Sequence, residues 1–134
     1  MSSLLTPLDS PIMSVRNRTV MSAMTRGFAD ADHRATPEIV AYYRRRAEGG
    51  VGLILTEGVV IHPEGDGYKD VPRIATAAQA ESWRPVVDAV HEAGAKIACQ
   101  LWHCGRISHS DFTDGLKPVS STERAAEGIN RQND

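Results

Sequence analysis

The sequence predicts an α/β fold in which short strands alternate with helices in the order β-α-β-α-β. Three observations lead to this prediction: apolar runs over residues 19–24, 51–56 and 96–102, helical spacing of apolar residues between them, and polar residues after each run. Such units build either a doubly wound sheet or a (β/α)₈ barrel, and both place functional residues at the carboxyl ends of the strands. No Gly-x-Gly-x-x-Gly follows the first run, which argues against the dinucleotide-binding version.

Composition narrows the class of protein. The chain has 134 residues, of which 41% are hydrophobic, and a formal net charge of −2, so one domain is expected. No apolar run has the 18 or more residues of a membrane span, and the first residues lack the pattern of a signal peptide. Two cysteines are too few for a disulfide framework, so a cytoplasmic protein is expected. The absence of a basic patch argues against a nucleic-acid partner.

The first half of the chain is expected to supply a strand and a helix. Residues 1–18 contain prolines and serines, which indicates a surface lead-in with turns. The run Thr19–Met24 is short enough for a buried strand. Thr36 then fits a helix N-cap before Pro37, which predicts a helix near 37–48 that ends at Gly49.

The second half repeats this order. The run 51–56 is typical of a parallel strand covered on both faces, and a long loop over 62–74 follows. Thr76 and Gln79 fit a capping box that opens a helix near 77–93, in which Pro85 predicts a kink or a late start near Ser82. Residues 96–102 form the third expected strand, and residues 107–134 are expected to be a polar tail.

Gln100 is the first candidate for a functional side chain. It lies near the end of a strand that is expected to be buried, and an unpaired buried amide costs about 1–3 kcal/mol. Either neighbouring backbone satisfies the amide in the core, or a ligand does. Its neighbours in the fold are expected at the ends of the other two strands, in Ala23-Met-Thr25 and Thr56-Glu-Gly58.

Motifs over nearly the whole chain resemble the old yellow enzyme family, the FMN-dependent NAD(P)H:flavin oxidoreductases and ene-reductases. The matching motifs are Leu5-Thr-Pro-Leu8, Val15-Arg-Asn-Arg18, Ala23-Met-Thr-Arg26, Thr56-Glu-Gly58, Pro63-Glu-Gly-x-Gly-Tyr68, Trp83 to His91, Gln100-Leu-Trp-His-x-Gly-Arg106, Ser108-His109 and Ala125-Ala-Glu-Gly128. The resemblance implies an α/β chain that forms the N-terminal part of a (β/α)₈ TIM barrel, with FMN at its mouth.

The resemblance also implies roles for individual residues. Ala23, Met24 and Thr25 would contact the flavin from the end of the first strand, with the Thr25 hydroxyl near O4, where it tunes the reduction potential. The family usually has Pro where this chain has Ala23, and a backbone contact survives that change. Gly58 would let the backbone approach the ring system, and Gln100 would bond its pyrimidine edge. On the substrate side the resemblance implies Trp102 and Tyr68.

Each role has a structural alternative. Thr25 would otherwise cap a turn, Gly58 would allow a left-handed turn, and Trp102 would pack in the core. His103, Cys104 and His109 suggest zinc, but four ligands at recognised spacings are absent, so no metal is predicted. Cys104 is also a candidate reactive thiol, although nothing in the sequence indicates a lowered pKa.

The chain is short for the fold that the resemblance implies. Such a barrel needs eight strands and about 250 residues, and this chain is expected to supply three strands. The family's proton donor, substrate anchors and main FMN-phosphate loops lie beyond the third strand. One hypothesis is therefore an FMN-dependent oxidoreductase that passes hydride from NAD(P)H through flavin to an activated alkene such as an enone. The alternative is a truncated, non-catalytic remnant or subunit that needs self-association or a partner chain to complete the barrel.

Overall fold

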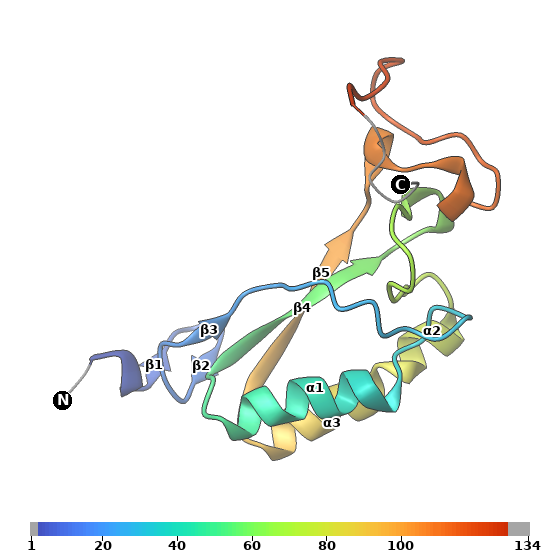
Figure 1. Cartoon of the computed structure of the whole chain (residues 1–134). Coiled ribbons are helices and arrows are strands. Elements are labelled where there is room, and N and C mark those ends of the chain that lie inside the picture. The colour runs from blue at the N-terminus through green and yellow to red at the C-terminus, as the bar shows by residue number, and fades with distance from the viewer. Residues whose placement is uncertain (1–2, 129–134) are drawn as a thin grey trace.

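A three-stranded parallel sheet with helices on one side forms the body of the chain. The computed structural model describes residues 3–128. The strands lie in the order β3 (Val20–Met21), β4 (Leu53–Val60) and β5 (Lys96–Trp102). Helix α1 (Pro37–Glu48) connects β3 to β4, and α2 (Ala77–Ser82) and α3 (Arg84–Glu92) connect β4 to β5 (Figure 1). The predicted β-α-β-α-β order with parallel pairing is confirmed, and the three-stranded sheet is open within the described residues.

Strand β3, the first strand of the parallel sheet, is shorter than the apolar run 19–24. Only Val20 and Met21 pair with β4, opposite Leu53 and Ile54, and the chain then continues without ladder pairing. Before this strand the structure contains an antiparallel pair that the sequence did not indicate, β1 (Leu8–Asp9) with β2 (Ser14–Val15). The Ser10 side chain closes the connection between them, because its hydroxyl donates to the Met13 carbonyl and accepts the Met13 N–H.

Local signals fix the helix ends. The Thr36 hydroxyl accepts the Ile39 N–H at the start of α1, and Thr76 and Gln79 form the predicted capping box at the start of α2. The second helical stretch is broken at Trp83, and Pro85 lies in the first turn of α3. Proline has no N–H to continue the helix and its ring clashes with the preceding turn, so a break is the expected response.

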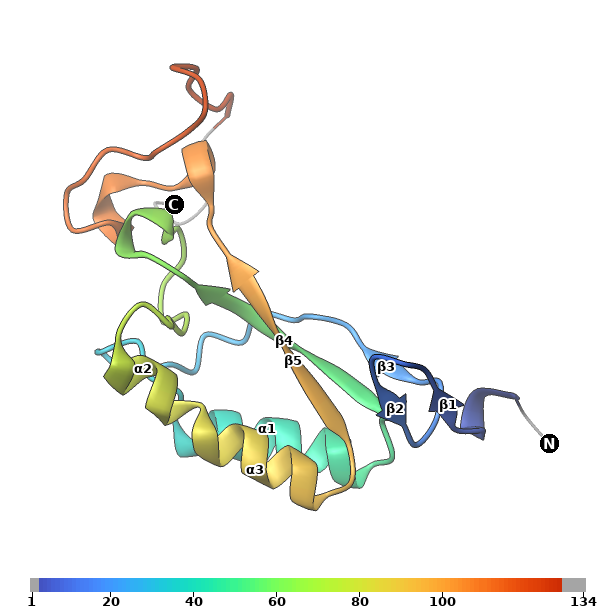
Figure 2. The ribbon, with the colours of Figure 1, turned by 180° about the vertical axis from the view of Figure 1, so that it is seen from behind.

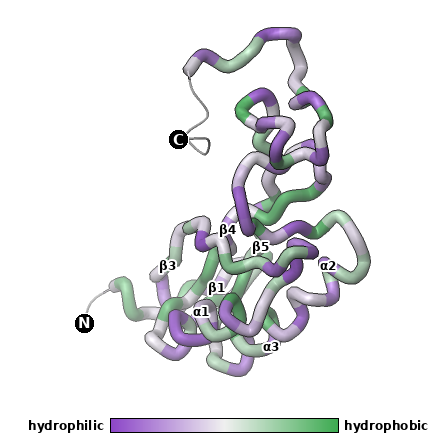
Figure 3. Tube along the Cα trace, turned by 45° about the vertical axis from the view of Figure 1, so that its right-hand side comes forward, coloured by the Kyte–Doolittle hydropathy of each residue, from purple (hydrophilic) through white to green (hydrophobic). Residues whose placement is uncertain are grey.

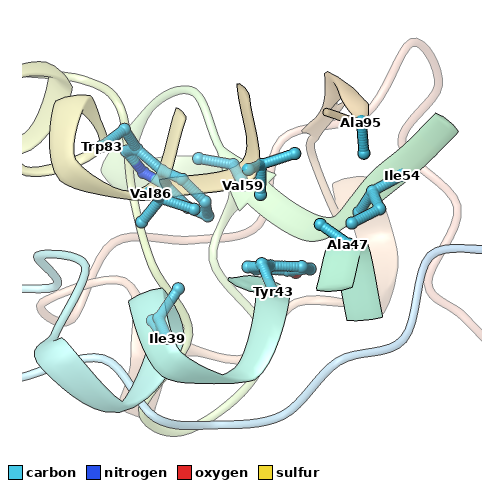
Figure 4. Close-up of a cluster of buried hydrophobic side chains, with 9 residues drawn as sticks. Ile39, Tyr43, Ala47, Ile54, Val59, Trp83, Val86 and Ala95 are labelled. Atoms are coloured by element: carbon cyan, nitrogen blue, oxygen red, sulfur yellow. The ribbon is translucent and has the colours of Figure 1, made fainter. Parts of the chain in front are cut away.

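The core lies between the helices and the sheet. Its buried members are Ile39, Tyr43, Ala47, Ile54, Val59, Trp83, Val86, Val90 and Ala95. Figure 4 shows the α1 side chains facing those of α3 and β4. Burial of each large apolar side chain stabilises the fold by about 1.5–3 kcal/mol.

The Arg16 side chain links the segment before the parallel sheet to the carboxyl ends of both helices. The Arg16 guanidinium, just after β2, donates to the Ala93 carbonyl (2.8 Å) at the end of α3 and to the Ala47 carbonyl in the last turn of α1. It also donates to the Val51 carbonyl at 2.8 Å. A cation at helix carboxyl ends satisfies unpaired carbonyls and complements the helix dipoles.

Strand β5 is largely exposed, contrary to the expectation of a buried third strand. Five of its seven residues are exposed, and Leu101 keeps 66% of its surface. The reason is that, among residues 3–128, β5 pairs only with β4 and forms the edge of an open sheet, and both α1 and α3 lie on the same side of that sheet (Figure 2). Figure 3 shows hydrophobic colour running along β4 and β5 through the middle of the molecule.

Within residues 3–128, no helix has the length and apolarity needed to cross a bilayer.

Candidate functional site

The carboxyl ends of β4 and β5 bring two of the predicted residues side by side. Gly58 and Gln100 are direct partners across the parallel pair. The register shifts between Leu55 and Gly58, so Thr56 and Glu57 form an irregularity in the middle of β4. There the Gln100 N–H donates to the Thr56 hydroxyl at 2.9 Å. Gly58 thus lies within a continuous strand and has no left-handed φ, which excludes the left-handed-turn alternative.

The two predicted substrate-side residues form an aromatic pair. The rings of Tyr68 and Trp102 stack with centroids 5.0 Å apart and planes 28° apart. Trp102 is half-buried and Tyr68 is 36% exposed, so the pair forms an accessible wall rather than part of the core. Position 58 requires glycine where the Trp102 ring packs against it, since a Cβ there would lie 2.6 Å from Cδ2 of Trp102.

Most of the remaining predicted residues are exposed to solvent. Met24 and Thr25 are exposed and Ala23 is half-buried, in the segment that leaves β3. Gln100 is exposed as well, so the expectation of a buried amide is wrong for this chain. The sheet face and edge that would enclose it are not covered within the described residues, and its amide is therefore available to a ligand.

Glu57 lies in the predicted strand-end motif Thr56-Glu-Gly58, but the sequence assigned it no role of its own. Its side chain is fully buried at the irregularity in the middle of β4, where Oε2 accepts the Arg26 N–H at 3.0 Å. Its own N–H donates to the Tyr43 hydroxyl at 2.6 Å. Burial raises the pKa of this carboxyl, and the backbone N–H groups of Arg26 and Gly27 oppose that rise. A charged residue interrupting an apolar strand was the signal in the sequence.

Asp66 organises the loop that carries Tyr68. Its Oδ1 accepts the N–H groups of Gly67 (2.8 Å) and Tyr68 (3.3 Å). Its Oδ2 accepts Nε of Arg73 at 2.8 Å, in an ion pair whose side chains are 1% and 10% exposed. The Ser108 hydroxyl donates to the Asp66 carbonyl, which joins the loop to the segment after β5. An aspartate between two glycines was the only hint of this role in the sequence.

Cys104 and the histidines His103 and His109, which follow β5, do not gather as a metal site in the described structure. No three His, Cys, Asp or Glu side chains in residues 3–128 gather as a candidate metal site. Burial raises the pKa of the Cys104 thiol to about 11, which is opposite to the shift that a reactive thiol needs. His103 instead packs its ring against Gly65.

A hollow of about 1340 Å³ lies beyond the aromatic pair. Its walls are Gly67, Tyr68, residues 106–109 and tail residues between Lys117 and Gly128. Tyr68 is the predicted site residue that lines it, while Thr25, Gly58 and Gln100 lie elsewhere on the sheet edge. The hollow therefore adjoins Tyr68 and not the paired residues Gly58 and Gln100.

Comparisons with known proteins identify relatives of this chain. Residues 3–133 match the model of the NADH:flavin oxidoreductase / NADH oxidase family. A putative 12-oxophytodienoate reductase 2 from Oryza sativa subsp. japonica is 42% identical over 122 residues, which is 90% of this chain and 32% of that relative.

Solved structures agree with this match. The old yellow enzyme homologue from Zymomonas mobilis superposes with a TM-score of 0.87 at 39% identity, over 95% of this chain and 35% of the other. Morphinone reductase superposes with a TM-score of 0.86 at 41% identity, over 94% and 33%. This chain spans about a third of the length of the relatives it matches.

Proposed function

This chain belongs to the NADH:flavin oxidoreductase / NADH oxidase family, and we propose that it contributes the flavin-ring side of an FMN-dependent oxidoreductase site. The observation that carries the proposal is the direct pairing of Gly58 with Gln100 at the carboxyl edge of the sheet. In barrels of parallel strands, that edge is where active sites form.

The residues present fit the ring of a flavin. Gln100 offers an exposed amide that both donates and accepts hydrogen bonds, which suits a ring edge with alternating donors and acceptors. Thr25 offers an exposed hydroxyl, and Ala23 and Met24 offer backbone groups from the same segment. When bound, FMN would supply hydride transfer from NAD(P)H to an activated alkene such as an enone.

Trp102 and Tyr68 would bind and orient the substrate. Their stacked rings give a planar apolar surface that excludes water from one side of the site. Morphinone reductase, which superposes on this chain, has been solved in complex with tetrahydroNAD. That relative supports a nicotinamide reductant for the proposed reaction here.

Both cysteines are free, and we include a cytoplasmic location in the proposal.

A second candidate function rests on the outer edge of β5, which pairs with no strand in the part of the chain that the structure describes. A sheet with an open edge accepts further strands, so a partner chain or a second copy would complete the barrel around a chain that is not catalytic by itself. In that case the flavin-edge residues would contribute to a site shared between chains.

The visible absorbance spectrum of the 134-residue chain after incubation with FMN and desalting tests the proposal, with the molar mass measured by light scattering. A retained flavin band supports flavin binding by this chain. The same band in a species larger than a monomer favours completion by association. A folded, colourless chain contradicts flavin binding by these residues alone.

A further inference from the structure

Glu57 combines two properties that rarely occur together. Its side chain is fully buried, and one carboxylate oxygen, Oε1, is buried without a hydrogen-bond partner among the described residues. Leaving a buried polar group unpaired costs about 1–3 kcal/mol, so an apolar side chain would serve the core better. The residue therefore calls for an explanation other than packing.

The carboxylate's other oxygen binds a segment that the sheet does not hold. Strand β3 pairs with β4 only at Val20 and Met21, and the following residues, which include Thr25, lack ladder hydrogen bonds. The Arg26 N–H bonds Glu57 Oε2 at 3.0 Å, and the Gly27 N–H also interacts with the carboxylate. Glu57 thus replaces, with its side chain, the strand pairing that stops after Met21.

Glu57 is itself held from two directions. Its N–H donates to the Tyr43 hydroxyl of α1, at 2.6 Å. Its neighbours in β4 contact the other strand end, since Thr56 accepts the Gln100 N–H and Gly58 pairs with Gln100. A side chain supported in this way can hold a segment that lacks strand pairing, with little freedom of its own.

We propose that Glu57 is a positioning residue that holds Thr25–Gly27 against β4 and so fixes the Thr25 hydroxyl at the same strand edge as Gln100. The inference rests on the proposed function for the role of Thr25, while the contact that it uses is independent of any cofactor. Glu57 acts through Thr25 and does not touch the reacting groups.

Amide hydrogen exchange of the 134-residue chain without cofactor tests the contact. In Glu57→Ala, we expect the protection of the Arg26 and Gly27 amides to fall by about tenfold or more relative to amides of the β4–β5 ladder. Glu57→Gln keeps an oxygen acceptor and should restore most of that protection. Tyr43→Phe is the matched control, because it removes the other contact of Glu57 and leaves the carboxylate in place.

A measurement on the unmutated chain covers the case in which Glu57→Ala does not fold. The Arg26 amide proton should show a chemical-shift step as Glu57 titrates, because its N–H bonds that carboxylate. No step, or unchanged protection in a folded Glu57→Ala, overturns the inference.

Flavin binding separates this inference from the proposed function. If the unmutated chain retains FMN, Glu57→Ala should raise its dissociation constant about tenfold and shift the flavin absorbance maximum, and Glu57→Gln should restore both. Unchanged affinity and spectrum in folded Glu57→Ala overturn the positioning role. If the unmutated chain retains no FMN, the proposed function fails, and the exchange result still decides whether Glu57 holds the segment.

Discussion

The indole of Trp102 lies against the backbone of Gly58, in the space that a side chain at that position would fill. A Cβ there would lie 2.6 Å from Cδ2 and 3.0 Å from Cζ3 of the ring. The two residues come from neighbouring strands, where Val60 is the partner of Trp102 and Gly58 the partner of Gln100. The glycine therefore lets the aromatic pair of Trp102 and Tyr68 sit close to the sheet at the proposed site.

Gly58→Ala should displace the Trp102 ring. Overpacking of this kind costs about 1–3 kcal/mol, and we expect a loss of that size in the free energy of unfolding, with a changed near-ultraviolet circular dichroism signal. A double-mutant cycle with Trp102→Ala isolates the contact. Without the indole, Gly58→Ala should cost much less, and equal costs in both backgrounds would rule out the clash.

Arg16→Met should destabilise the junction of the two helices with the sheet. The guanidinium donates to carbonyls of Ala47, Val51 and Ala93, and hydrogen bonds from charged groups contribute about 1.5–3 kcal/mol each. We expect a loss of at least about 2 kcal/mol in urea unfolding. Arg18→Met is the control, because Arg18 is exposed and should change stability by less than about 0.5 kcal/mol. Similar losses in both variants would show that the Arg16 hydrogen bonds do not stabilise this junction specifically.

Glu57 predicts a pH dependence of stability with a definite sign. Burial raises the pKa of its carboxyl in the folded chain above the unfolded value of about 4.3. The folded state then binds more protons, so this contribution is fully present below the unfolded pKa and is lost as pH rises through the folded pKa. Glu57→Gln removes the titration, and its stability relative to the unmutated chain should therefore rise with pH across that window.

Urea unfolding at several pH values between 4 and 8 measures this difference. Glu123→Gln, an exposed carboxyl in the tail, should run parallel to the unmutated chain. A Glu57→Gln curve that also stays parallel would show that Glu57 ionises equally in both states.

Much of the fold follows from local signals in the sequence. Thr36 and the Thr76–Gln79 capping box locate helix starts because their side chains accept backbone N–H groups of the first turn. Pro37 suits the first turn because the N–H that proline lacks would be unpaired there. The short β3 and the exposed β5 could not be predicted in the same way. Strand length and burial depend on which partners cover a strand, and periodicity records only the strand's own residues.

The candidate site was predictable only in part. Gly58, Gln100, Trp102 and Tyr68 stand out by residue type and motif, and the structure brings them together in two contacting pairs. Glu57 acts through a backbone N–H 31 residues earlier in the chain, a contact that depends on the irregularity in β4. Such contacts leave no spacing in the sequence to detect.

Asp66→Asn should loosen the loop that carries Tyr68. Removing one partner of a buried ion pair costs about 3–5 kcal/mol, because the Arg73 guanidinium stays buried without its counter-charge. We expect faster amide exchange across residues 62–74 and loss of the Tyr68–Trp102 stacking signal in near-ultraviolet circular dichroism. Asp70→Asn in the same loop is the matched control, since Asp70 is exposed and asparagine tolerates its positive φ of 56°. Equal effects of the two substitutions would contradict a special role for Asp66.

Gln100→Ala should weaken FMN binding without changing the free energy of unfolding. The side chain is exposed at the edge of the sheet, so its removal should change the free energy of unfolding by less than about 0.5 kcal/mol. If its amide bonds the flavin ring, FMN retention after desalting should fall by about fivefold or more, as expected for the loss of hydrogen bonds worth about 1 kcal/mol each. Lys96→Ala, exposed on the same strand, should leave retention unchanged. Unchanged flavin content in Gln100→Ala would remove Gln100 from the proposed site, and a parallel loss in Lys96→Ala would attribute the effect to the strand rather than to the amide.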